Sequence, residues 1–231
     1  MGVLPEGPDA WENIVSNTTS KSANEAKEAR EAAVAAKKEP RLVRIAAAQF
    51  QVGKDAASAV AACCNAMQQA RAVSCDLVVL PGHAKAIGTE PLDGPFHKRV
   101  AAEAKRLEIA VAVALHLTDG VGVVLLDKKG ATLGVQYGAK NAEVFDLHKF
   151  GGKVVLKTGQ HAAGAKDLAG AELVIQSLNA PGACCIADDA GAAMSSGDKA
   201  KPYDLVFEDL EPAKPHYKKK HAFLVVAAPA K

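Results

Sequence analysis

Five cysteines are the side chains with the broadest chemistry here, because a thiolate attacks carbonyl carbons, binds metals and forms disulfides. They occur as two adjacent pairs, Cys63-Cys64 and Cys184-Cys185, and as the single Cys75. Neither spacing gives the C-x-x-C pattern of zinc sites and redox centres. An odd number of cysteines in a chain without a secretory signal is typical of a reducing compartment. We therefore expect buried, reduced thiols in an intracellular protein, either cytoplasmic or in an organelle matrix.

Other patterns that carry chemistry are missing from the sequence. No Gly-x-Ser-x-Gly elbow occurs, and Gly120 and Gly122 lack the third glycine of a dinucleotide-binding loop. The seven histidines have no paired spacing that would indicate a metal site. We expect neither a metal ion nor an organic cofactor.

The composition excludes several classes of protein. A chain of 231 residues with 49% hydrophobic residues is large and apolar enough to bury a core. A charged fraction of 23% and a net charge of +2 argue against nucleic-acid binding and against global disorder. No apolar run approaches the roughly eighteen residues of a transmembrane helix. The sequence thus predicts a folded protein without a transmembrane segment.

The first forty residues differ from the rest and form what we expect to be an arm. Residues 22–38 consist almost entirely of strong helix formers, and Pro40 ends the predicted helix. No apolar stripe runs along this helix, so it has little to dock on in its own chain. We predict two parts, a helical arm at 1–40 and a domain at 41–231. The large apolar residues expected to anchor the arm on another subunit are Trp11, Ile14 and Val15.

From residue 41 the hydrophobic pattern alternates between strand and helix periods. A βαβαβββ order is followed by βαβ, with further strands after residue 203. This order predicts an α/β sandwich in which helices cover one face of a mixed sheet. We expect strands at 42–50, 76–80, 109–117, 121–126, 132–137, 153–158 and 172–178, and helices at 55–72, from Pro95 onward, and at 161–169.

The order of these segments resembles the nitrilase superfamily of carbon–nitrogen hydrolases. The run VRIAAAQF, a long helix and the run CDLVVLPG are similar to the opening of that family, where the first strand typically ends in Ala-x-x-Gln and the second in Leu-Pro-Glu. The likeness continues through the D-x-x-G turn of VGVVLLDKKGATLGVQY and the Gly-Ala-Glu-Leu at 170–173. The resemblance implies a nitrilase-like α-β-β-α sandwich, and an unrelated α/β fold is the alternative.

The same resemblance implies three catalytic side chains, a Glu base, a charge-stabilising Lys and a Cys nucleophile. Where the family has Glu after its second strand, this chain has Gly82, and the next acidic residue, Glu90, falls in a loop. Where the family has Lys, this chain has Ala139, with Lys140 one residue further on. Where the family has Cys, it has Thr158. The resemblance therefore implies a protein that has lost its catalytic residues.

Three functions follow from this interpretation and stay open. The first is a catalytically inactive structural or scaffolding subunit of a larger hetero-oligomeric assembly. The second is a regulatory ligand-binding module that keeps a remnant pocket. The third is a weak amide hydrolase with a rebuilt site.

The expected partners of such a subunit are other protein chains. Proteins with this fold usually pair through helix-covered faces, so the resemblance implies nitrilase-like pairing through the helix at 161–169. A short apolar strand near the C-terminus could add to a sheet edge of this chain or of a neighbour. The residues expected at these contacts are Ala162, Ala165, Leu168 and Phe223.

Overall fold

A computed structural model gives the three-dimensional structure of the protein. Leu42–Lys231 forms one compact unit and Met1–Arg41 another. The second of these, with the predicted helix of the arm and its anchors Trp11, Ile14 and Val15, lies outside the described residues. The structure describes residues 43–51, 54–82, 87–138, 144–147, 152–159, 173–178, 184–187, 193–198, 201–210 and 223–230.

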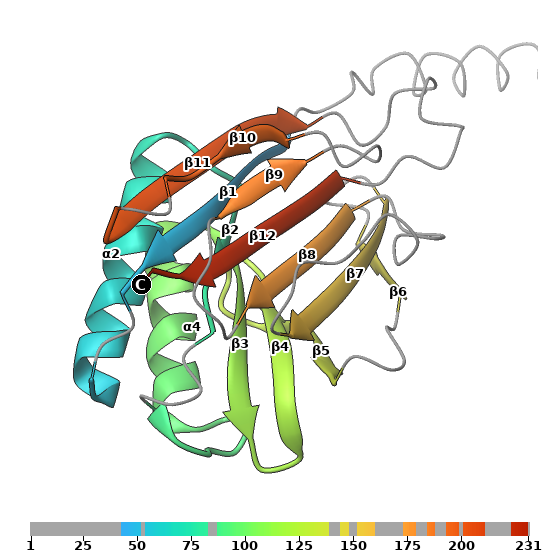
Figure 1. Cartoon of the computed structure of the whole chain (residues 1–231). Coiled ribbons are helices and arrows are strands. Elements are labelled where there is room, and N and C mark those ends of the chain that lie inside the picture. Colours follow the sequence, from blue (N-terminus) through green and yellow to red (C-terminus); the bar gives the residue numbers. More distant parts are fainter. Residues whose placement is uncertain are drawn as a thin grey trace, which may run out of the picture. The chain divides into compact units, whose positions relative to one another are not determined.

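The described part of Leu42–Lys231 begins with strands alternating with helices and continues mainly as strands (Figure 1). Helix α2 spans Ala56–Ala72 and helix α4 spans Pro95–Leu107. The strands are β1 (Val43–Phe50), β2 (Leu77–Leu80), β3 (Ala110–Leu117), β4 (Gly120–Leu126), β5 (Thr132–Tyr137), β6 (Val144–Leu147), β7 (Gly152–Gly159), β8 (Leu173–Leu178), β9 (Cys185–Ala187), β10 (Ala193–Ser196), β11 (Tyr203–Leu210) and β12 (Phe223–Pro229).

The strands build two layers that meet at β1. The first layer runs β5-β4-β3-β2-β1-β11, and the second runs β6-β7-β8-β12-β9-β10. Strand β1 pairs antiparallel with β11 along its whole length. Only its last two residues, Gln49 and Phe50, pair with the parallel strand β12. The mixed α/β arrangement predicted from the sequence is confirmed, and its sheet separates into two layers at this junction (Figure 1).

The first layer of strands has a hydrophobic core on each of its two faces. One core lies between the two layers of strands and contains Ile45, Val79 and Ile175. The other lies between the first layer and helices α2 and α4, with Met67 and Val100 fully buried. Because strand residues alternate between faces, β1 sends Ile45 and Ala47 into one core and Ala46 and Ala48 into the other.

Local signals set the ends of the helices as the sequence predicts. Asp55 caps α2 by accepting a 2.8 Å hydrogen bond from the backbone N–H of Ser58, whose hydroxyl in turn accepts from the N–H of Asp55. Helix α4 opens with Pro95 in its first turn. Its buried face consists of Phe96, Val100 and Ala104.

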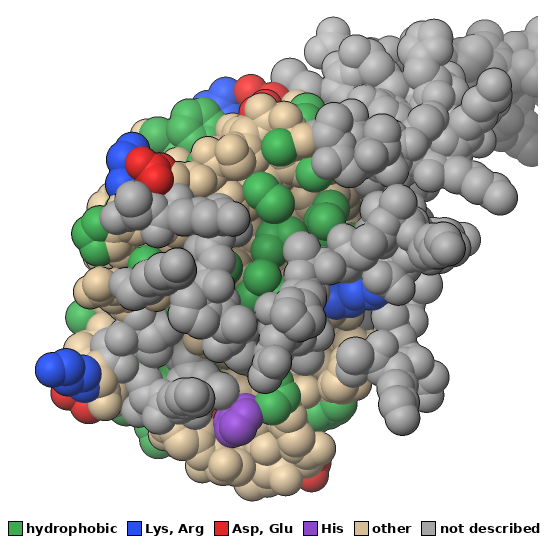
Figure 2. Space-filling model, in the orientation of Figure 1, with side chains coloured by type: hydrophobic (Ala, Val, Ile, Leu, Met, Phe, Trp, Pro, Cys, Tyr) green, Lys and Arg blue, Asp and Glu red, His purple; other side chains and the backbone are tan. Residues whose placement is uncertain are grey.

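The outer face of the second layer is also apolar. Hydrophobic side chains gather in the middle of this face, over β12 and β8 (Figure 2). An apolar outer face calls for a further covering layer, as the expected α-β-β-α order requires. The predicted helix at 161–169, with Ala162, Ala165 and Leu168, lies outside the described residues. The buried residues of this face are Val155, Val174, Leu178, Ala187, Leu224, Val226 and Ala228.

The C-terminal strand corrects one prediction. The segment beginning at Phe223 was expected to add to a sheet edge, whereas β12 lies between β1 and β8. Its side chains are buried on both faces, which is typical of a strand inside a parallel sheet. Phe223 itself is only 8% exposed and belongs to the core between the layers. The short run of hydrophobic residues therefore completes the centre of the fold.

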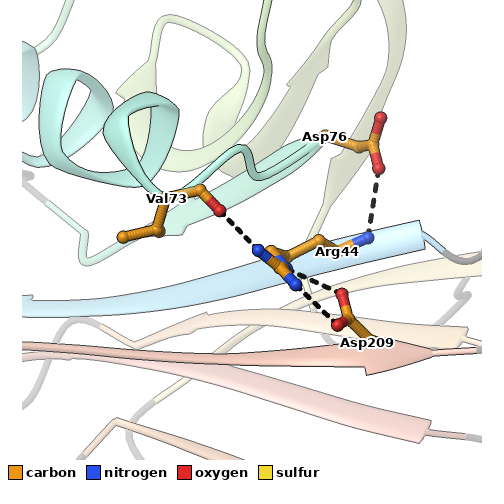
Figure 3. A network of polar contacts seen from close by, with 4 residues as sticks. All are labelled: Arg44, Val73, Asp76 and Asp209. Carbon is orange, nitrogen blue, oxygen red and sulfur yellow. Dashed lines mark hydrogen bonds and ion pairs between the residues drawn. The ribbon is translucent and has the colours of Figure 1, made fainter.

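A polar network ties β1 to its neighbours at the surface (Figure 3). The Arg44 guanidinium donates two 2.7 Å hydrogen bonds to the two carboxylate oxygens of Asp209 on β11. It donates a third bond to the carbonyl of Val73, which follows α2. The backbone N–H of Arg44 donates to the carboxylate of Asp76. One side chain thus links β1, β11 and the end of α2.

A buried amide links the end of β1 to two distant segments. Gln49 has no exposed surface. Its Nε2 donates to the carbonyls of Asp198 and Lys201, at 2.9 and 3.0 Å, and its Oε1 accepts a 3.0 Å bond from the N–H of Cys184. Three backbone groups that lie far from β1 in the sequence therefore depend on this one side chain.

We predict that Gln49→Leu destabilises the protein by about 3 kcal/mol, because it leaves a buried N–H and two carbonyls without their partner. Urea denaturation measures the effect. The matched control is Gln68→Leu, which removes an exposed amide whose one hydrogen bond within the described residues is to Glu103, and it should change stability by less than about 0.5 kcal/mol. Equal losses in the two variants would contradict the assigned role of Gln49.

Candidate functional site

The two expected positions that the structure describes belong to strands of different layers, β2 and β7, and both lie close to the end of β8. Strand β2 is followed by Pro81 and Gly82, both buried. The N–H of Gly82 donates a 2.9 Å hydrogen bond to the carbonyl of Leu178 at the end of β8. Strand β7 pairs with β8 so that Thr158 lies opposite Ser177 and Gly159 opposite Leu178. The fold thus brings the backbones of positions 82 and 158 to the same region.

Ser177 joins the two layers at this strand end. Its hydroxyl donates a 2.7 Å bond to the carbonyl of Leu80 and accepts a 3.0 Å bond from the N–H of Ala114. The side chain is fully buried. The hydroxyl therefore donates one hydrogen bond and accepts another, and these bonds hold β8 against β2 and β3. A buried hydroxyl held in this way is unsuited to act as a nucleophile. The sequence patterns gave no signal for this residue.

The remaining predicted positions cannot be placed as side chains. Ala139 and Lys140 lie outside the described residues, and of Thr158 only the backbone is described. Gly82, the one expected position that is described in full, supplies no ionisable group. The described part of the site contains backbone groups and the Ser177 hydroxyl, and it brings no carboxylate to position 82.

All five cysteines are described, and none belongs to β2, β7 or β8. Burial raises the pKa of each thiol above its ordinary value of 9.0, to about 12 at Cys75 and about 11 at Cys184. A catalytic thiol needs a lowered pKa, which a nearby cation or helix N-terminus provides. All five are free thiols, of which Cys63, Cys75 and Cys184 are buried and Cys64 and Cys185 are half-buried.

Glu90 has a role that its position in the sequence does not reveal. It lies in the connection between β2 and α4, as expected, but its side chain is only 7% exposed and its backbone forms an isolated bridge with Leu117 at the end of β3. Its two carboxylate oxygens accept hydrogen bonds from the N–H groups of Phe96 and His97, at 3.1 and 3.0 Å. Glu90 therefore caps α4, whose N-cap residue, Gly94, has no side chain.

Two general features of the described residues bear on other functions. They contain no group of three or more His, Cys, Asp or Glu side chains arranged to hold a metal ion. Among the helices that the structure describes, none is long and apolar enough to cross a membrane.

The fold is similar to that of several solved structures. The chain is similar to a cysteine-to-alanine mutant of an amidase of the nitrilase superfamily from Nesterenkonia, with a TM-score of 0.62 and 14% identity over 73% of this chain and 90% of that chain. A double mutant of that amidase in complex with acrylamide gives a TM-score of 0.62 and 14% identity over 79% of this chain and 94% of that chain. Another crystal structure of the Nesterenkonia amidase gives 0.60, with 77% and 93% covered.

No family model matches the sequence, and no curated protein matches it at a significant level. The TM-score of 0.62 shows a shared fold, and at 14% identity the activity of the amidase is not transferred to this chain. The protein therefore has an α/β fold with a mixed sheet that resembles the nitrilase fold, as the order of its sequence segments predicts.

The raised thiol pKa values predict a loss of stability at high pH. In the unfolded chain the thiols ionise near pH 9.0, whereas Cys184 and Cys75 keep their protons in the folded protein until about pH 11 and 12. Unfolding then releases protons, so the stabilisation is complete below pH 9.0 and is lost as the pH rises toward 12. Urea midpoints measured from pH 7 to 10.5 should fall above pH 9, and less steeply in Cys75→Ala. Rapid alkylation of one thiol by iodoacetamide at pH 7 would contradict this assignment.

Proposed function

We propose that the protein is a catalytically inactive relative of the nitrilase-fold enzymes that serves as a structural subunit of a larger assembly. The observation that carries the proposal is the residue found at position 82. The resemblance implies a Glu base there, and the chain has a glycine whose N–H is bonded to the carbonyl of Leu178. Without a carboxylate at that place, a nucleophile on β7 has no general base from β2.

The thiols support the same conclusion. A carbon–nitrogen hydrolase of this type needs a cysteine at the end of β7, where this chain has Thr158. The cysteines that are present lie on other elements, with raised pKa values. The Glu, Lys and Cys of such an enzyme act together, so a chain that lacks two of them retains little catalysis from the third.

The edges of the two layers support a role in assembly. Within the described residues, β11 pairs only with β1 and β10 pairs only with β9, so each ends its layer. Phe207 on β11 and Met194 on β10 are 42% and 45% exposed. Edge strands offer unpaired backbone groups to other chains, and exposed large hydrophobic residues favour such contacts. A second protein chain is the occupant that we propose for these edges.

Activity assays test the first half of the proposal. We expect the full-length protein to hydrolyse no member of a panel of amides, nitriles and N-carbamyl compounds, because position 82 lacks the base and position 158 the thiol. Thr158→Ala and Lys140→Ala serve as controls, with circular dichroism to confirm folding. Turnover that disappears in either variant would overturn the proposal in favour of a rebuilt hydrolase site.

Co-purification tests the second half. We expect the native protein to elute from its source in a particle much larger than its own 23.9 kDa, together with other chains. Deleting residues 1–38 should release those chains while the domain stays folded, because Trp11, Ile14 and Val15 are the anchors that we propose for the arm. Elution of the native protein as a monomer would contradict a structural role. Unchanged co-purification of the truncated protein would contradict the role of the arm alone.

A further inference from the structure

A hollow of about 530 Å³ lies on the helix side of the first layer. It is formed by the first turns of α2 and α4 and by the segment 87–90. These two helices lie side by side against the same face of the strands (Figure 1). The hollow lies on the opposite face of the first layer from the core between the layers. Its lining residues include neither Gly82 nor Ser177.

The walls of the hollow are mainly apolar. Ala57 and Val60 contribute from α2, Phe96 from α4 and Ile87 from the connecting segment. Val60 and Ile87 are only partly buried against the core beneath them, so each keeps apolar surface toward the hollow. Small-molecule sites commonly have volumes of about 300 to 1,000 Å³, with apolar walls and a few polar groups. The hollow has the size and lining for the apolar body of a small ligand.

The polar groups that line the hollow favour a negatively charged group on the ligand beside Arg99. Glu90 also lines it, but both of its carboxylate oxygens are engaged by α4, whose N-terminal dipole offsets the charge. Arg99 is exposed and is the one cation among the described lining residues.

The acidic neighbour of Arg99 on α4 is already engaged. Glu103 accepts hydrogen bonds from Arg106 and Gln68. Within the described residues Arg99 forms no ion pair of its own. Its guanidinium, with several donors in one plane, is therefore available to a carboxylate or sulfonate at the rim of the hollow.

We propose that this hollow binds a small amphiphilic anion, with its apolar body against Val60, Ile87 and Phe96 and its acidic group on Arg99. This binding function is independent of the proposed structural role. It requires no chemistry at the strand ends, and it involves residues of the helix layer instead.

Two fluorescent probes separate the apolar and the charged contributions. The first, 1-anilinonaphthalene-8-sulfonate, carries an aromatic body and a sulfonate, and the second, N-phenyl-1-naphthylamine, carries the body alone. Each is titrated into the full-length protein and its variants. Ala57→Trp fills the hollow from an exposed position on α2, and Ala61→Trp, one turn further along and also exposed, is its matched control. Arg99→Gln removes the cation, and Lys105→Gln, which removes an exposed cation further along the same helix, is its control.

We expect one site for each probe. Ala57→Trp should weaken both probes by at least about tenfold, because the apolar body loses its place. Arg99→Gln should weaken the sulfonate by about fivefold to tenfold and leave the neutral probe unchanged, because only a charge-assisted contact is lost. Both control variants should bind like the unmodified protein. The proposal is overturned if Ala57→Trp binds both probes normally, if Arg99→Gln binds the sulfonate normally, or if the controls lose as much affinity as their partners.

Discussion

The full burial of the Gln49 amide is the constraint on which the arrangement of the two layers depends. At this residue β1 still pairs with β11 and has just begun to pair with β12. A buried amide without partners would be costly, so the N–H of Cys184 and the carbonyls of Asp198 and Lys201 must come to it. These contacts fix where β9 and β11 begin. The second layer is thereby placed against the first.

Close packing of the layers follows from the same region. Ala46, Ala47 and Ala48 bring the backbone of β1 near its neighbours on both faces, and all three are fully buried. In the second layer, the Ser177 hydroxyl forms hydrogen bonds with backbone groups of both β2 and β3. The strand ends are joined by the hydrogen bond from Gly82 to Leu178. The region where a nitrilase-like enzyme would hold its base is held together in this chain by hydrogen bonds of the fold itself.

Two sets of charged side chains support the framework of the fold. Arg44 and Asp209 face each other at the surface, about 34% and 41% exposed, and join two strands and a helix end. Glu90 is buried because it replaces the N-cap side chain that Gly94 lacks. A Cβ at Gly94 would come within 2.6 Å of the Glu90 carboxyl carbon, so the glycine and the carboxylate require each other.

Several elements could be predicted because their signals are local. The cap at Asp55, the helical spacing of Phe96, Val100 and Ala104, and the strand at Thr132–Tyr137 each depend on neighbours within a few residues. The resemblance of the segment order also indicated the fold correctly. The glycine at position 82 was evident from the sequence, although its hydrogen bond to Leu178 was not.

Only the tertiary structure decided which segments lie at the centre and which polar groups meet. The sequence predicted an edge position for the segment at Phe223, because a short apolar run has the same local pattern at an edge and in the interior. It also gave neither Glu90 nor Ser177 a role, since their partners lie six residues away in one case and more than sixty in the other. The sequence by itself determined the two capped helices and the apolar strands, which depend on residue identity and local spacing. Pairing between distant strands, and the burial that follows from it, depends on the whole chain folding at once.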